Sequence, residues 1–234
     1  MGSPFLTTSW SLISQTREPG ETARVATAAL CQQYWHPLYV YIRRAGQSAH
    51  AAEDTVQDFF IHVVEDDVFA RADAERGRFR TFLLAALRQF LARQHRDQTR
   101  QKRAPGSKLL SLDVEHAEKV LADSADASPD RAFDRAWALT QLDLTWRRLE
   151  EEHRDDGKAD LVRLLRPVIS GTVATPIREI AAQLSMSEGA VNVAAHRLRR
   201  RFGEALRKQV AQTLVSQEEV DDEIGRLRAV LAAT

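Results

Sequence analysis

The stretch of sequence that decides the fold is TPIREIAAQLSMSEGAVNVAAHRLRRRF, residues 175–202. Thr175 and Pro176 are typical of a helix start, because threonine can cap free backbone N–H groups and proline fits the first turn. Apolar residues recur at helical spacing on both sides of a short turn at residues 184–187, where Ser187 can cap a second helix. The pattern therefore predicts a helix-turn-helix.

The second of these helices carries a polar and basic face, which is the first candidate site. Such a helix fits the major groove of DNA, where side chains near its start contact base edges and later arginines hold phosphates. The alternative is an ordinary helical hairpin with a basic surface, and we favour DNA binding. The candidate DNA-binding residues are Ser187, Glu188, Asn192, His196, Arg197, Arg199 and Arg200.

The remaining sequence also predicts helices. Glycine is rare, β-branched runs are absent, and Ala, Leu, Arg, Glu and Gln dominate. Pro37 should kink or interrupt the first helix. Ser48 and Ser128 stand where they can act as N-caps. Before the helix-turn-helix, helices are expected at about residues 21–44, 49–65 and 79–100, from residue 129 onward, and at about 159–169.

The expected architecture is all-α, with two small helical domains joined by a flexible linker. A Pro-Gly-Ser sequence and a run of small and acidic residues indicate the linker. The acidic segment after residue 212 has apolar residues at helical spacing, so it could pack on either domain or compete with DNA for the basic helices. The expected divisions are a flexible leader at 1–20, a first domain at 21–104, the linker at 105–128, a second domain containing the helix-turn-helix at 129–212, and an acidic helical extension at 213–234.

The composition limits the class of protein. Of the 234 residues, 44% are hydrophobic and 28% are charged, which is the ordinary globular range and excludes a wholly disordered chain. The single cysteine, Cys31, excludes an internal disulfide and suits a reducing compartment. No apolar run is long enough for a membrane helix, and the first residues lack a secretory pattern. We therefore expect a cytoplasmic protein.

The charges are segregated along the chain, although 33 basic and 33 acidic residues balance. Residues 76–103 contain eight Arg and one Lys against one acid, and residues 197–208 contain five Arg and one Lys against one acid. Residues 111–160 instead contain fourteen acids and seven bases. Two basic segments in an otherwise acidic chain indicate two contacts with a polyanion.

A second candidate surface lies in the helix expected at residues 49–65. Acidic and amide side chains there share or adjoin one helical face, beside a Phe59-Phe60 pair that should anchor the helix to the core. Such a face is either a solvated acidic surface or a docking surface for another protein. The docking candidates are Glu53, Asp54, Gln57 and Asp58.

The order and spacing of these segments resemble an extracytoplasmic-function (ECF) sigma factor of bacterial RNA polymerase, from about residue 25 to 210. The segments that carry the resemblance are YWHPLYVYIRR at 34–44, AEDTVQDFF at 52–60, RFRTFL at 78–83, and Ile180-Ala181 followed by SEGAV at 187–191 and His196-Arg197. The resemblance implies a first domain that binds the polymerase clamp and melts the −10 promoter element. It implies a second domain that contacts the −35 element and the polymerase flap, and no catalytic chemistry.

The resemblance also assigns roles to the candidate residues. The docking candidates correspond to the polymerase-binding helix, and the polar face after residue 187 corresponds to the −35 contact. Phe82 could stack on an unpaired base or pack in the core, and packing is favoured. The implied −10 contacts are Arg78, Arg80, Phe82, Arg88, Arg93, Arg96 and Arg100.

Several positions depart from the family pattern. Gln89 replaces an asparagine that is usual in the promoter-melting helix. Ser185 stands where glycine is common, because glycine tolerates a positive φ. Asn192 and Ala194 stand where basic residues are frequent, so the preferred −35 sequence should differ from that of better-known members.

Thr55 lies in the polymerase-binding helix, where the family more often has a hydrophobic residue. Either its hydroxyl bonds a preceding backbone carbonyl, or it is a phosphoacceptor, as in a branch of the family that it resembles. A phosphate would add about −1.5 to −2 charges beside two acids. The implied partners are core RNA polymerase, promoter DNA, and an anti-sigma factor or a Ser/Thr kinase as regulator, with no cofactor.

Two other classes of function compete with this interpretation. A dimeric helix-turn-helix regulator would use the same DNA-binding helix, but it leaves the acidic face and the basic segment at 76–103 unexplained. An enzyme is disfavoured because the seven histidines form no metal-ligand pair and no Gly-rich phosphate loop occurs.

Overall fold

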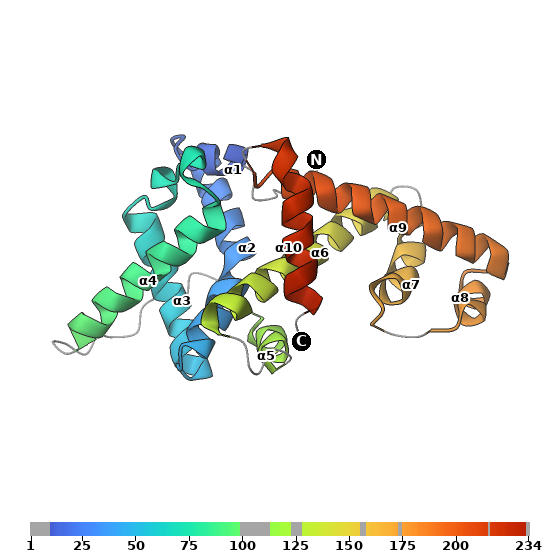
Figure 1. Ribbon diagram of the computed structural model, residues 1–234, viewed down its shortest axis with the longest axis horizontal. Coiled ribbons are helices and arrows are strands. Elements are labelled where there is room, and N and C mark those ends of the chain that lie inside the picture. The colour runs from blue at the N-terminus through green and yellow to red at the C-terminus, as the bar shows by residue number, and fades with distance from the viewer. Residues whose placement is uncertain are drawn as a thin grey trace. The chain divides into compact units, whose positions relative to one another are not determined.

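The computed structural model describes residues 10–98, 113–122, 128–154, 158–172, 175–214 and 216–232, and every regular element in these ranges is a helix (Figure 1). The prediction of an all-α fold is confirmed. The chain forms two compact units. As far as they are described, the N-terminal unit comprises residues 6–140 and 211–234, and the C-terminal unit comprises residues 141–210.

The N-terminal unit is built around α2, which is one continuous helix through Pro37. The expected interruption does not occur. Proline removes one backbone hydrogen bond, but the neighbouring Leu38 and Tyr39 are fully buried, so tertiary packing holds the helix together. The elements of this unit are α1 (Trp10–Gln15), α2 (Glu21–Arg44), α3 (Ala49–Glu65), η1 (Phe69–Arg71), η2 (Ala74–Arg76), α4 (Phe79–Gln98), α5 (Val114–Ala122), the start of α6 (Pro129–Arg154), η3 (Gln217–Glu219) and α10 (Val220–Ala232).

Aromatic side chains form the centre of this unit. Phe59 and Phe60 on α3 are fully buried, as the sequence predicts. Phe79, at the start of α4, lies with its ring centroid 5.4 Å from that of Tyr34 and 5.6 Å from that of Phe69. These contacts fix the start of α4 against α2 and η1, so the position of the basic helix is set by the core.

The serine caps predicted for α3 and α6 are present. The Ser48 hydroxyl accepts a hydrogen bond from the backbone N–H of Ala51 at 3.3 Å. The Ser128 hydroxyl accepts one from the backbone N–H of Arg131 at 3.4 Å. Each satisfies an N–H group that the helix itself leaves unpaired.

The segment predicted as a linker contains α5. Its Ala117 and Val120 are buried, and its Glu118 carboxylate accepts hydrogen bonds from the guanidinium of Arg43, at 2.6 Å and 2.9 Å, and from the hydroxyl of Tyr39, at 2.6 Å. The Arg43 guanidinium and the Tyr39 hydroxyl hold the pKa of Glu118 below its ordinary value. Burial, together with the adjacent Glu118 carboxylate, raises the pKa of Tyr39. Part of the expected linker is therefore tied to α2.

The boundary between the two units also differs from the one predicted. The sequence places a boundary at residue 129 and treats residues 213–234 as an extension. In the structure, residues 129–140 of α6 and all of α10 belong to the N-terminal unit. The acidic extension therefore packs within the unit that contains α4.

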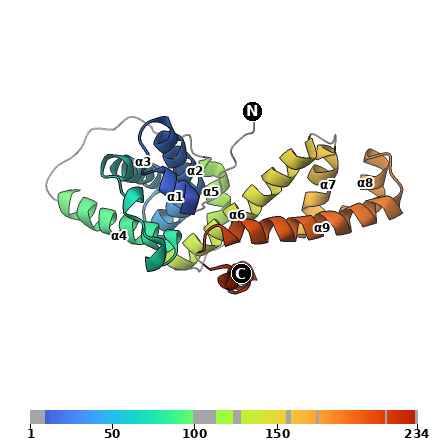
Figure 2. The same cartoon turned by 90° about the horizontal axis from the view of Figure 1, so that it is seen from above.

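In the C-terminal unit, α8 (Ile177–Gln183) and α9 (Glu188–Ala211) lie where the sequence predicts a helix-turn-helix. The core of this unit includes Trp146, Val162, Ile180, Val191 and Leu198. Figure 2 shows α7 between the end of α6 and α9, with α8 beside the start of α9. The elements of this unit are the end of α6, α7 (Ala159–Ser170), α8 (Ile177–Gln183) and α9 (Glu188–Ala211).

The start of α8 differs slightly from the prediction. The helix begins at Ile177, and Pro176 is its N-cap residue, without a side-chain cap. Pro176 has a φ of −58° and a ψ of 135°, which is an extended backbone and not a first helical turn. Thr175 therefore stands one residue too early to act as the cap.

Candidate nucleic-acid interface

The polar face of α9 is exposed along its whole predicted length. Ser187, Glu188, Asn192, His196, Arg197, Arg199 and Arg200 are all exposed, as the helical spacing predicts. The opposite side of α9 is buried through Val191, Ala195 and Leu198. The hydroxyl of Ser187 caps the helix by accepting a hydrogen bond from the backbone N–H of Ala190 at 3.2 Å.

The turn before α9 contains a strained residue. Ser185 has a φ of +52°, which lies in the left-handed region that favours glycine. The backbone N–H of Met186 donates to the carbonyl of Ala181 at 2.9 Å and closes the turn. This conformation brings Ser187 to the start of α9, where it acts as the cap.

The later part of α9 anchors the helix in the C-terminal unit. Phe202 stacks on Trp146 of α6, with ring centroids 4.3 Å apart and an interplanar angle of 25°. Arg201 forms an ion pair with Glu152 at 3.1 Å, and Arg200 forms one with Glu204 at 3.4 Å. The aromatic stack therefore fixes the direction in which the polar face of α9 points.

Val193 and Met186 are apolar side chains that the sequence pattern did not single out. Val193 is 51% exposed and Met186 is 36% exposed, beside the polar face and the turn that precedes it. A signal was available, because Val193 falls outside the buried helical spacing of Val191, Ala195 and Leu198. An exposed apolar side chain on such a helix can contact a thymine methyl group.

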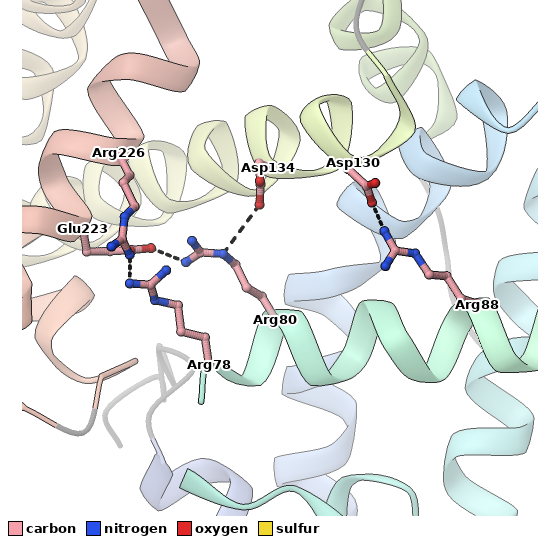
Figure 3. A network of polar contacts seen from close by, with 7 residues as sticks. All are labelled: Arg78, Arg80, Arg88, Asp130, Asp134, Glu223 and Arg226. Atoms are coloured by element: carbon pink, nitrogen blue, oxygen red, sulfur yellow. Dashed lines mark hydrogen bonds and ion pairs between the residues drawn. The ribbon is translucent and has the colours of Figure 1, made fainter. Parts of the chain in front are cut away.

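The arginines predicted to contact DNA, on α4 and beside its ends, fall into two groups. Arg93 and Arg96 are exposed, and Arg100 lies outside the described residues. Arg78, Arg80 and Arg88 instead extend toward α6 and α10, where each meets a carboxylate (Figure 3).

Arg78 and Arg80 share the carboxylate of Glu223 on α10. A guanidinium nitrogen of Arg78 lies 3.1 Å from one oxygen, and Arg80 donates a hydrogen bond to the other. Arg226 lies 3.4 Å from the first of these oxygens. Glu223 is fully buried, and a buried carboxylate requires cationic partners of this kind.

Arg80 also contacts α6. Its guanidinium lies over the ring of Trp137, 4.3 Å from the ring centroid, and 3.6 Å from a carboxylate oxygen of Asp134. Burial raises the pKa of Asp134 above its ordinary value; the positive charge of Arg80 opposes this shift, and the negative charges of Glu223 and Asp130 add to it. Asp130 in turn forms an ion pair with Arg88.

Phe82 is only partly exposed. Its ring lies 6.1 Å from that of Phe79, at an interplanar angle of 33°. This contact supports the packing role that the sequence favours for Phe82.

The docking candidates on α3 are not equally accessible. Asp54 and Asp58 are exposed, Glu53 is half-buried, and Gln57 is buried with 5% of its surface exposed. Asp54 lies 3.6 Å from the imidazole of His50. The surface that a partner could contact is therefore centred on Asp54 and Asp58.

Thr55 is also buried, with 5% of its surface exposed. Its hydroxyl donates a hydrogen bond to the side-chain oxygen of Gln47 at 2.8 Å. The acceptor is thus a side-chain amide, where the sequence suggested a preceding backbone carbonyl.

The search for other kinds of site gives negative results for the described part of the chain. Among those residues, no group of three or more His, Cys, Asp or Glu side chains could hold a metal ion. No helix in the described ranges has the length and hydropathy needed to cross a membrane.

A comparison with protein families identifies the class of the protein. The family described as ECF sigma factor matches residues 11–208, which include α2, α3, α4, α8 and most of α9. The chain therefore belongs to the ECF sigma factor family, whose members direct promoter-specific transcription initiation with RNA polymerase and are not enzymes. Searches of the curated proteins and of the solved structures return no match.

Proposed function

We propose that this sigma factor contacts the −35 element through the exposed face of α9 and the −10 element through α4. The observation that carries the proposal is the run of exposed polar residues on α9, directly after a tight turn and opposite a buried apolar stripe. Asn192 lies near the start of the helix, where a side chain can reach base edges, and Val193 adds an apolar contact. The later arginines hold phosphates.

We further propose that Asp54 and Asp58 dock on a basic surface of core polymerase. Both side chains are exposed on a helix whose other side is fixed by Phe59 and Phe60. Because α3 is held rigidly, its carboxylates are already positioned and little entropy is lost on docking. A dimeric repressor would have no use for this acidic face.

The experiment that tests both proposals is in vitro transcription with purified core polymerase on a promoter library. Wild type should initiate at a subset of sequences that share −35 and −10 elements. The double variant Asp54→Arg/Asp58→Arg should lose co-purification with core polymerase, because two attractions become repulsions. A matched double variant at exposed acids elsewhere in the N-terminal unit, Glu18→Arg/Glu75→Arg, should keep it.

The outcomes separate the alternatives. Unchanged co-purification of the Asp54→Arg/Asp58→Arg variant would refute the docking surface. Dimers that bind a palindrome without polymerase would instead support the helix-turn-helix regulator.

Phosphorylation of Thr55 remains a proposal about regulation. The hydroxyl is enclosed and bonded to Gln47, so a kinase could reach it only after this part of α3 opens. A phosphate would break that hydrogen bond and place negative charge between Asp54 and the buried core. Mass spectrometry of the protein from growing cells tests whether the modification occurs.

A further inference from the structure

We propose that α10 is an intramolecular competitor of promoter DNA, in which the Glu223 carboxylate occupies the arginines that a phosphate group would otherwise contact. The inference rests on the proposed function, in which α4 contacts the −10 element, and on the resemblance, which places Arg78 and Arg80 among the −10 contacts. In the free protein, Glu223 would therefore hold α4 in a state with reduced affinity for DNA.

The contacts of Glu223 resemble those of a bound phosphate. One of its oxygens accepts from Arg80, and the other lies 3.1 Å from Arg78 and 3.4 Å from Arg226. Guanidinium N–H groups donate to carboxylate and to phosphate oxygens alike. The same nitrogen atoms cannot serve Glu223 and a DNA phosphate at once, so the two ligands exclude each other.

Carboxylates of α6 extend the same arrangement along α4. Asp134 lies 3.6 Å from Arg80, and Asp130 pairs with Arg88, so three successive arginines on this side of α4 face acids (Figure 3). Arg93 and Arg96, further along α4, are exposed. The three arginines paired with Glu223, Asp134 and Asp130 thus lie next to α10 and α6.

The attachment of α10 is limited enough to be reversible. Its buried apolar side chains are Val220, Ile224 and Leu227, on the same face as Glu223. Asp222 on another face is exposed. When a phosphate replaces Glu223, the arginines keep an anionic partner, and the cost of release is the exposure of this apolar strip together with the hydrogen bond that Arg135 donates to the carbonyl of Leu231 at 3.1 Å.

Binding of a random-sequence single-stranded DNA 20-mer, measured by fluorescence anisotropy on the full-length protein, tests the proposal. Glu223→Gln keeps the shape of the side chain and removes its charge. We expect the variant to bind at least about fivefold more tightly at low salt, the lower end of typical coupling effects. Because two arginines are released, its log–log salt dependence should be steeper by about 1.4, at about 0.7 for each phosphate on single strands.

The matched control is Asp222→Asn, which removes the same charge from an exposed position in the same helix. It should change the affinity less than twofold and leave the salt dependence unchanged. If Glu223→Gln behaves like Asp222→Asn, the competition by α10 does not exist.

A third variant separates this inference from the proposed function. Adding Arg80→Gln to Glu223→Gln should remove most of the gain, because the released guanidinium is then missing. If Arg80→Gln has no effect in that background, the assignment of Arg80 to DNA is wrong. If Arg80→Gln weakens binding but Glu223→Gln gives no gain, the assignment stands and only the competition fails.

A measurement on the unmodified protein guards against a variant that fails to fold. Backbone amides of α10 should exchange with solvent faster once saturating 20-mer is added, since the helix leaves α4. Unchanged protection of residues 220–232 at full DNA occupancy would overturn the proposal.

Discussion

Replacing Ser185 by glycine should stabilise the C-terminal unit. Ser185 has a φ of +52° and an exposed side chain, so the substitution relieves backbone strain without removing a buried contact. The left-handed conformation costs an L residue about 1–2 kcal/mol. Glycine loses about 0.4–1 kcal/mol more entropy on folding, which offsets part of the gain. The net stabilisation should be about 0.5–1 kcal/mol.

Thermal unfolding, together with hydrogen exchange of amides in α8 and α9, provides the assay. A gain of this size raises the melting temperature of a unit of about 70 residues by roughly 2–8 °C. Protection should increase in α8 and α9 and stay constant in α2, because α2 belongs to the other unit.

The control variant should change the stability in the opposite direction. Ser187→Ala removes the cap of α9 and should cost about 1 kcal/mol. A melting temperature for Ser185→Gly at or below that of wild type would refute the argument from strain.

Three further predictions concern other sites. Glu118→Gln should destabilise the N-terminal unit by about 1 kcal/mol at pH 7, since its hydrogen bonds are charge-assisted and partly exposed. Arg43 and Tyr39 lower the pKa of Glu118 below its ordinary value of 4.5. The difference in unfolding free energy between wild type and variant should therefore be complete above pH 4.5 and disappear as the pH falls through the lowered pKa of Glu118. Urea unfolding at pH 7 and at acid pH measures this difference. Asn192→Ala should change the −35 preference at one or two positions by about 1–3 kcal/mol, whereas Arg200→Ala should weaken all sequences alike; selection from a promoter library distinguishes them. Thr55→Val should lower the free energy of unfolding by about 1 kcal/mol through its lost hydrogen bond without altering polymerase binding; altered binding under conditions where both proteins are fully folded would support a regulatory hydroxyl.

The sequence predicted α2, α3 and α4 well because their signals are local, but α1 and α5 lie in the segments expected as a flexible leader and a linker. The bounds expected for α2 and α3 match the structure, since Gly46 follows the first helix and the Ser48 cap starts the second. The buried side of α9 follows from helical spacing alone. Such features depend on residues within a few positions of one another.

Contacts between distant segments could not be predicted in this way. Arg80 and Glu223 are 143 positions apart, and nothing in either segment identifies the other as its partner. The burial of Gln57 also depends on packing against distant segments, so helical spacing alone could not distinguish it from the exposed acids beside it. The sequence did not single out Glu118, because its contact with Arg43 depends on the packing of α5 against α2.

The exposed face and the anchoring residues of α9 lie in different turns of the helix, and this separation has an evolutionary consequence. Residues 188–200 carry the exposed face that we propose contacts DNA, while the stack of Phe202 on Trp146 and the buried Gln209 and Val210 hold the helix from its later turns. Substitutions on the exposed face can therefore accumulate with little loss of stability. A lineage of such proteins can acquire new target promoters by drift at a few surface positions, and an engineer can exchange the same positions between relatives while leaving the scaffold intact.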